Sequence, residues 1–308
     1  MKNASVIFIV IVIIALGGYI LLKKGTFDYT ASPADQTTEQ TTSDEPIVTE
    51  EETEDTTPLA FERETVIGTS ANGNDITAYH FGTGSTEIMF IGGIHGGYSF
   101  NTALVGFELI DYLKEHKDAI PENETITVIP VLNPDGLEAV VGTTGRFDGS
   151  TVTKNDEARV LGRFNGNEVD LNRNFDCEWT ATATWQNRSV SGGDTQFSEP
   201  EAQAIEDYVT EHKPSAAIVY YSQAGGVYSS TCKNGILPET TALTNTYAKA
   251  SEYPAYEKFD YYTITGDMVN WFAKEKIPAI SVLLTNHEGT EWNKNQKGID
   301  AVLQSYAQ

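Results

Sequence analysis

The chain has 308 residues, a formal net charge of −24 at pH 7 and a hydrophobic content of 40%. This length allows one large α/β domain or two ordinary domains, and the acidity argues strongly against nucleic acid as a partner, because few basic side chains are available to meet phosphates. Only two cysteines, Cys177 and Cys232, are present and they form no Cys-x-x-Cys motif, so neither a thiolate zinc site nor a redox pair is indicated.

The first residues have the pattern of a membrane anchor. An almost unbroken apolar run extends from Val6 to Leu22, with Lys2 before it and Lys23 and Lys24 after it. At 1.5 Å per residue, this run is about long enough to cross a bilayer. A cleaved signal peptide is the alternative, but the apolar stretch is long for that role and no clear Ala-x-Ala site follows it. We therefore expect residues 1–25 to form an uncleaved transmembrane helix.

Residues 26–58 differ abruptly in composition from the rest of the chain. Thr, Glu, Asp and Ser dominate, and no Lys or Arg occurs between Lys24 and Arg63. Such a segment cannot bury enough apolar surface to offset the entropy lost on ordering, and its like charges repel each other and extend it. We expect a disordered acidic tether between the membrane anchor and a globular domain at residues 59–308.

In the globular part, strand and helix patterns alternate. Strand-like apolar runs occur at residues 76–81, 88–92, 126–132, 216–221, 259–263 and 279–284, and helical spacing occurs at 102–117, 199–213, 237–250, 267–276 and 291–307. Ser198 and Glu201 have the spacing of a capping box at the start of the 199–213 helix. This alternation predicts one α/β domain with a largely parallel sheet.

A glycine-rich turn, Gly92-Gly93-Ile94-His95-Gly96-Gly97, follows the predicted strand at 88–92 and precedes the helix at 102–117. Open α/β sheets bind ligands outside the carboxyl ends of their strands, and glycines let the backbone approach a bound group closely. His95 is therefore a candidate functional residue. A hydrogen-bonded loop histidine in a tight turn is the alternative.

Two polar stretches interrupt the alternation of strands and helices. Residues 163–175 carry Arg163 and Arg173 in an Asn-rich loop, where the two guanidinium groups could bind a carboxylate bidentately. An ordinary polar loop with surface ion pairs explains the same residues equally well. Residues 261–271 form a loop that opens a helix, for which Thr265 or Asp267 is the expected N-cap.

Taken together and in this order, these stretches resemble the zinc carboxypeptidase family, the carboxypeptidase A-like metallopeptidases. The resemblance runs from about Phe61 to the C-terminus. It rests on Gly92-Gly-Ile-His-Gly96, on Arg163 followed by Val169-Asp-Leu-Asn-Arg-Asn-Phe175, on Tyr220-Tyr-Ser-Gln223, and on Tyr262 nine residues before Trp271. The resemblance implies a single α/β/α domain around a mixed, mostly parallel eight-stranded sheet.

The resemblance also implies a zinc site, which this sequence retains only in part. The family holds its zinc with two histidines and a glutamate, and His95 matches the first histidine. Tyr98 and Ser99 stand where the glutamate is expected, Tyr221 stands at the second histidine, and Leu283 stands at the general-base glutamate. Catalytic zinc normally needs three protein ligands, and the mechanism needs a carboxylate that takes a proton from bound water. We therefore expect zinc to be absent or weakly bound and the protein to be a pseudoenzyme.

The substrate-binding residues of the family are retained. Arg163 matches the arginine that polarises the scissile carbonyl, Asn172 and Arg173 match the pair that clamps the terminal carboxylate, and Tyr262 matches the mobile tyrosine that closes over the substrate. The resemblance therefore implies that the protein binds the C-termini of peptides or of cell-wall peptides. Val269 lies in the stretch that lines the side-chain pocket in relatives, which favours a small or apolar terminal residue.

Two other functions are compatible with the sequence. The first is an active metallocarboxypeptidase with a rearranged metal site, which would recruit His287, Glu288 or Glu291 from the segment 286–291. The second is a membrane-tethered scaffold that binds neither metal nor peptide.

The family resemblance also bears on the two cysteines. Cys177 follows the Asn-Arg-Asn-Phe motif and Cys232 follows the Ser-Gln strand, and in this fold both loops should lie near the mouth of the site. One disulfide between them is therefore implied, with two unrelated thiols as the alternative. A disulfide agrees with a domain held outside the cytoplasm by its N-terminal helix.

Overall fold

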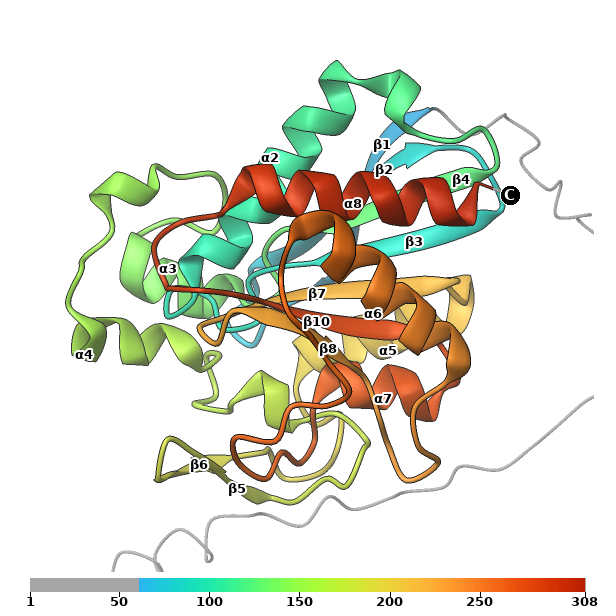
Figure 1. The fold of residues 1–308 in the computed structure, drawn as a ribbon. Coiled ribbons are helices and arrows are strands. Elements are labelled where there is room, and N and C mark those ends of the chain that lie inside the picture. The colour runs from blue at the N-terminus through green and yellow to red at the C-terminus, as the bar shows by residue number, and fades with distance from the viewer. Residues whose placement is uncertain (1–60, 308) are drawn as a thin grey trace, which may run out of the picture. The chain divides into compact units, whose positions relative to one another are not determined.

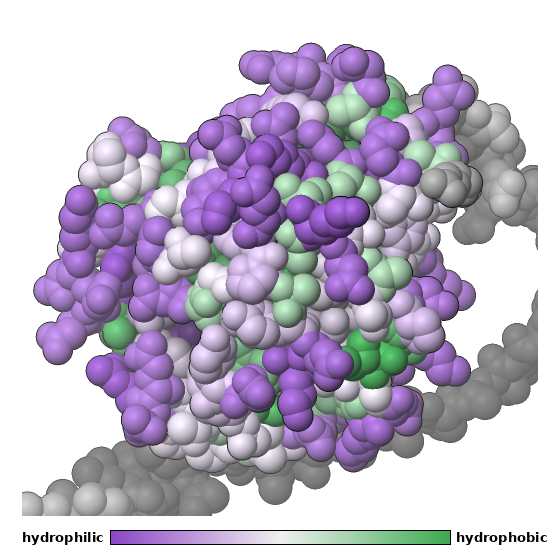
Figure 2. Space-filling model, in the orientation of Figure 1, coloured by the Kyte–Doolittle hydropathy of each residue, from purple (hydrophilic) through white to green (hydrophobic). Residues whose placement is uncertain are grey.

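The computed structural model describes residues 61–307 (Figure 1). The predicted membrane helix at 1–25 and the predicted tether at 26–58 lie outside the described residues. Within residues 61–307, no helix is long and apolar enough to cross a membrane. The face of the domain seen in Figure 2 is mostly hydrophilic, and its apolar side chains form small, separate patches.

A mixed eight-stranded sheet forms the centre of the described domain. Its strands are β1 (Glu62–Thr69), β2 (Asp75–Gly82), β3 (Thr86–Ile91), β4 (Glu124–Ile129), β7 (Ala216–Ser222), β8 (Gly226–Ser229), β9 (Ala255–Tyr256) and β10 (Ala279–Leu284), in the spatial order β1-β2-β4-β3-β7-β10-β8-β9. The central strands β4, β3, β7 and β10 are parallel to one another, whereas β1, β2 and β4 pair antiparallel, as do β10 and β8. The predicted mixed sheet is confirmed.

Helices cover both faces of this sheet (Figure 1). The helices are α2 (Phe100–Glu115), α3 (Pro134–Val141), α4 (Asp156–Arg159), α5 (Pro200–His212), α6 (Pro238–Ser251), α7 (Met268–Lys274) and α8 (Trp292–Tyr306). Side chains of α2, α6 and α8 share one apolar core with alternate strand residues such as Ile218 and Tyr220, and those of α5 and α7 share the other core with Val219 and Tyr221. This arrangement confirms the predicted α/β architecture.

Short elements connect the sheet to the site. Four 3₁₀ turns lie at η1 (Lys117–Ala119), η2 (Gly149–Thr151), η3 (Val160–Arg163) and η4 (Leu171–Arg173), and a separate hairpin is formed by β5 (Thr182–Trp185) and β6 (Arg188–Ser191). The disulfide between Cys177 and Cys232 is present, with the Cα atoms 6.1 Å apart. It joins the loop after η4 to the loop after β8, which confirms the pairing that the resemblance implied.

Two local predictions are wrong. Residues 259–263 form no strand, because the rings of Phe259 and Tyr261 pack around Tyr228 and the segment makes no ladder with the sheet. The capping box is also absent: Glu199 is the N-cap residue of α5, and the Glu201 carboxylate accepts hydrogen bonds from outside the helix. The N-cap at Asp267 is confirmed, since its Oδ1 accepts from the Asn270 amide at 2.9 Å.

Candidate functional site

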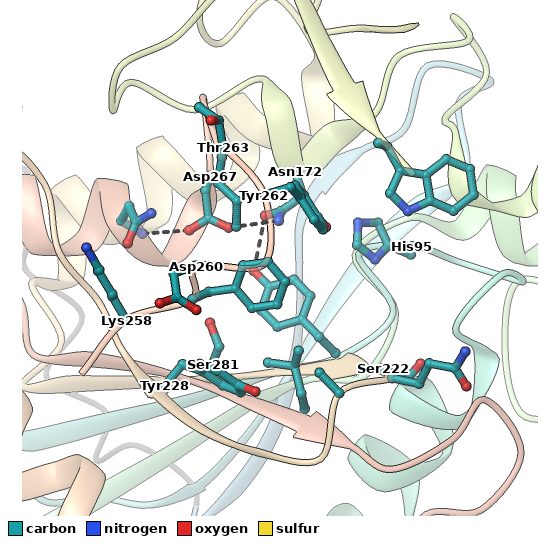
Figure 3. Close-up of a pocket in the computed structure, with 18 of the residues that line it drawn as sticks. His95, Asn172, Ser222, Tyr228, Lys258, Asp260, Tyr262, Thr263, Asp267 and Ser281 are labelled. Atoms are coloured by element: carbon teal, nitrogen blue, oxygen red, sulfur yellow. Dashed lines mark hydrogen bonds between the residues drawn. The ribbon is translucent and has the colours of Figure 1, made fainter. Parts of the chain in front are cut away.

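A cavity of about 480 Å³ lies near the carboxyl ends of β3, β7 and β10. Several residues singled out from the sequence line it. His95, Asn172 and Tyr262 are labelled in Figure 3, and the others are Tyr98, Arg163, Tyr221, Asp267, Leu283 and His287. Ser99, Arg173 and Val269 are buried but do not line the cavity. The structure therefore gathers most of the predicted site, which comes from turns and strands that are far apart in the sequence.

His95 is held in the glycine-rich turn between β3 and α2. Close packing requires glycine beside it, since Gly96 has φ +37° and an added Cβ would lie 2.6 Å from the backbone of Gly136. The His95 ring is buried, and neither of its nitrogens has a hydrogen-bond partner among residues 61–307, the nearest acid being Asp170 at 3.6 Å. Burial, reinforced by the charge of Arg163, lowers the pKa of His95 to about 4, so the ring is neutral at pH 7.

Tyr98, one of the two residues that the resemblance places at the glutamate ligand of the family, lines the cavity. Its ring packs edge-on against Trp185 and His287, with centroids 5.0 and 4.6 Å away, and its hydroxyl accepts a hydrogen bond from Gln186. Ser99 instead precedes α2 as its N-cap residue and is 1% exposed. Of the two residues considered for the glutamate position, Tyr98 is thus the one that lines the cavity.

Tyr221 and Leu283, which the resemblance places at the second histidine and at the general base of the family, also line the cavity. The Tyr221 ring lies 5.8 Å from the His95 ring, and its hydroxyl donates to Oδ1 of Asn172 at 3.1 Å. Burial raises the pKa of Tyr221 well above its usual value of 10, so it remains a neutral phenol. Leu283 on β10 presents a hydrocarbon side chain to the cavity.

The residues that surround His95 do not fit a catalytic zinc. Such a site needs three ligands from imidazole, thiolate or carboxylate groups. Across residues 61–307, no three His, Cys, Asp or Glu side chains come together in a way that could hold a metal ion. One neutral imidazole beside two phenols and a leucine lacks the three ligands that a catalytic zinc needs.

The rearranged metal site is not assembled either. His287 lines the cavity, but its Nδ1 lies 2.6 Å from the hydroxyl of Ser222. The carboxylate of Glu288 is exposed and lies 3.9 Å from Nζ of Lys154. The carboxylate of Glu291 accepts a hydrogen bond from the backbone amide of Thr285 at 2.7 Å. Neither glutamate lines the cavity.

Arg163 lines the cavity and forms a buried ion pair with Asp170. Its Nε donates to Oδ2 of Asp170 at 2.9 Å, its Nη2 lies 2.8 Å from the same oxygen, and its guanidinium stacks on Trp185 at 4.3 Å. Although burial opposes ionisation, the charge of Arg163 holds the pKa of Asp170 well below its usual range. Arg163 is only 3% exposed, yet it lines the cavity, so its guanidinium lies where a ligand in the cavity could meet it.

Asn172 is also engaged with the protein. Its Nδ2 donates to Oδ2 of Asp267 at 2.8 Å, and its Oδ1 accepts from the Tyr221 hydroxyl and from the Met268 amide (Figure 3). The neighbouring Arg173 is 1% exposed and donates to the carbonyl of Asn172 at 2.7 Å. The sequence patterns identified Asp267 only as a helix cap, because nothing local indicates a contact with a residue 95 positions away.

Tyr262 lies at the rim of the cavity. It is 37% exposed, and its ring lies 5.9 Å from the guanidinium carbon of Arg173. Trp185, which packs against Arg163 and Tyr98, comes from the β5–β6 hairpin and had no signal in the sequence.

Comparison with known proteins gives the following similarities. The family model for zinc carboxypeptidases matches residues 51–302. Among curated proteins, bacteriocin BCN5 of Clostridium perfringens is 30% identical over 148 residues, which is 47% of this chain and 15% of that protein. Human carboxypeptidase D is 34% identical over 98 residues, 30% of this chain and 6% of that protein. The chain thus matches only a small part of the length of either relative.

Solved structures with a similar fold include several carboxypeptidases. Bovine thrombin-activatable fibrinolysis inhibitor, in complex with tick carboxypeptidase inhibitor, has a TM-score of 0.62 at 15% identity, covering 80% of this chain and 88% of that chain. Carboxypeptidase A from Helicoverpa armigera gives 0.60 at 18%, with 80% and 69% covered. Murein-tripeptide amidase MpaA from Escherichia coli O157 gives 0.53 at 16%, with 79% and 96% covered. These likenesses show the fold.

Proposed function

The chain belongs to the zinc carboxypeptidase family, and we propose that it binds the C-terminal ends of peptides without hydrolysing them. One observation carries the proposal. The cavity persists, with His95 at its wall, but Tyr98, Tyr221 and Leu283 replace the groups that would complete a metal site and supply a base.

The chemistry of these side chains supports the loss of hydrolysis. A neutral phenol is a poor substitute for an imidazole or a carboxylate, and burial keeps Tyr221 neutral. A leucine cannot accept a proton from an attacking water. The two metal-ligand losses and the loss of the base all fall in one cavity, as expected for a site that no longer maintains its metal.

Binding of a peptide end is supported by the groups that remain in the cavity. The guanidinium of Arg163 lines the cavity, and Tyr262 lies exposed at the rim, where it can cover a ligand. We include cell-wall peptides among the proposed ligands, because one protein of similar structure is named as a murein-tripeptide amidase. In this proposal zinc is absent or weakly bound.

We further propose that residues 1–25 anchor the protein in a membrane and that residues 26–58 tether the domain outside the cytoplasm. The Cys177–Cys232 disulfide supports this location, because disulfides persist in oxidising compartments.

Isothermal titration of the purified protein with short peptides, including a murein tripeptide, tests the proposal. We expect binding to wild type and intact peptides by mass spectrometry after prolonged incubation. Arg163→Lys keeps the charge but loses the planar fork, so it should weaken binding, whereas Arg146→Lys, at an exposed site that pairs with Asp111 outside the cavity, should not. Equal binding by both variants, or shortened peptides, would contradict the proposal.

A further inference from the structure

The carboxylate of Asp267 accepts a hydrogen bond from the side-chain amide of Asn172. Its Oδ2 accepts from Asn172 Nδ2 at 2.8 Å, while its Oδ1 accepts from the backbone of Asn270 at 2.9 Å (Figure 3). Asp267 is 6% exposed and lines the same cavity. By the family resemblance, Asn172 is one of the two residues that would clamp the terminal carboxylate of a ligand, so the protein presents a carboxylate of its own at that position.

The backbone fixes Asp267 in this place. Gly266 has φ +64°, its amide donates to the carbonyl of Cys177 at 2.8 Å, and an added Cβ would lie 2.1 Å from the carbonyl oxygen of Arg173. The disulfide to Cys232 holds the Cys177 loop in turn. These contacts fix the backbone before Asp267, and the hydrogen bond from the Asn270 amide holds its carboxylate beside Asn172.

The buried charges beneath the cavity are balanced. Arg163 is paired with Asp170, and Arg173 lies within the field of two carboxylates, since Asp170 and Asp267 both raise its pKa against the opposing effect of burial. Two arginines thus face two carboxylates. A ligand carboxylate that enters here meets no uncompensated positive charge in this buried group.

We propose that Asp267 is an internal substitute for the terminal carboxylate of a ligand and thereby sets the charge of the peptide end that the cavity accepts. This inference rests on the proposed function. A free C-terminal carboxylate must share the amide of Asn172 with a second carboxylate, so it binds with uptake of one proton. A C-terminal amide carries no charge and avoids this repulsion.

The groups around Asp267 identify it as the residue that takes up the proton. Two carboxylates that share a site cannot both ionise easily, and burial already raises the pKa of Asp267 above 3.8. Arg173 on η4 is permanently charged, and Tyr221 on β7 remains a neutral phenol. The other carboxylate behind the cavity is Asp170, whose pKa Arg163 holds low despite its burial.

The rim loop adds two exposed charges to the cavity. Lys258 and Asp260 have opposite signs and lie close together in the sequence, so their fields largely cancel, and solvent screens both. Asp260→Asn is therefore a matched control. It removes one negative charge from the lining, as Asp267→Asn does, but leaves the Asn172 amide untouched.

Asp267→Asn is a conservative test of the inference. Asparagine is as good an N-cap as aspartate, so the bond to the Asn270 amide and the start of α7 are retained. The new side-chain amide turns a donor toward the donor of Asn172. The variant thus removes a competing carboxylate and leaves two N–H groups facing the place where a ligand carboxylate would lie.

The experiment compares acetyl-Ala-Ala-Ala with its C-terminal amide by isothermal titration of the full-length protein in nanodiscs between pH 5 and pH 8. Two buffers of different ionisation enthalpy count the protons taken up on binding. We expect wild type at pH 8 to bind the amide at least about tenfold more tightly than the acid, and to gain up to about tenfold in acid affinity for each pH unit lowered, with uptake of one proton.

For Asp267→Asn, we expect the preference for the amide and the proton uptake to disappear, while Asp260→Asn keeps both. Wild type that binds acid and amide equally, without proton uptake, would overturn the inference and leave the proposed function standing. If neither peptide binds to wild type, the proposed function fails and this inference fails with it.

Discussion

The buried carboxyl group of Glu124 should make the free energy of unfolding depend on pH. Glu124 is the first residue of β4 and is fully buried, and neither of its carboxylate oxygens has a hydrogen-bond partner within residues 61–307. Burial raises its pKa from 4.5 to about 7. The fold therefore accepts the neutral acid and disfavours the carboxylate.

The sign and size of the effect follow from this difference. Well below pH 4.5 the carboxyl group is neutral in both the folded and the unfolded state, so its ionisation does not change the free energy of unfolding. As the pH rises toward 7, the unfolded chain ionises first and the folded state loses stability. At 1.36 kcal/mol for each pKa unit, the full loss above pH 7 is about 3 kcal/mol, and the part that falls between pH 5 and pH 8 is about 2.5 kcal/mol.

The assay is urea denaturation of wild type and Glu124→Gln at pH 5 and pH 8. Glutamine does not ionise, so the variant should gain about 2.5 kcal/mol relative to wild type on going from pH 5 to pH 8. Glu122→Gln, at an exposed position two residues earlier, removes the same formal charge and should show no such gain. Parallel pH curves for wild type and Glu124→Gln would refute the reasoning.

Three further predictions concern the site. Replacing Cys177 by serine opens a disulfide that spans 55 residues, which should lower the free energy of unfolding by about 4 kcal/mol in the chain-entropy treatment; calorimetry with and without reductant measures it, and unchanged melting would contradict it. Tyr221→Phe removes the hydrogen bond to Asn172 and should cost about 1 kcal/mol in urea denaturation, a prediction that a variant as stable as wild type would rule out. Leu283→Glu restores a carboxylate without its metal ligands, so peptide release should stay at background while thermal stability falls; a gain of activity would count against the account.

The sequence predicted the central strands of the sheet, because their apolar residues can be recognised without knowing which strands lie beside them. β7 and β10 are nearly continuous apolar runs, β3 is apolar from Ile88 to Ile91, and β4 ends in apolar residues after Thr127; these strands are largely buried, and their patterns were recognised. The strands β5, β6, β8 and β9 have four residues or fewer, which is too short for a periodic signal. Residues 259–263 were wrongly predicted to form a strand because aromatic residues favour strands. In the structure the rings of Phe259 and Tyr261 pack around Tyr228 instead.

For the candidate site, the motifs identified the turn with His95 and the loop with Arg163 and Asn172. The sequence could not show which partners these side chains contact in the folded protein. The pairing of Asn172 with Asp267 joins residues 95 positions apart, and such contacts depend on tertiary packing that no local pattern encodes. The same holds for Trp185, whose hairpin places it against Arg163.

The most direct test of the central claim is the zinc content of the purified full-length protein, measured beside a peptide digest followed by mass spectrometry. His95 alone, with Tyr98, Tyr221 and Leu283 around the cavity, should retain zinc far below one ion per chain and leave every peptide intact. Stoichiometric zinc, together with loss of C-terminal residues that a chelator abolishes, would contradict the claim.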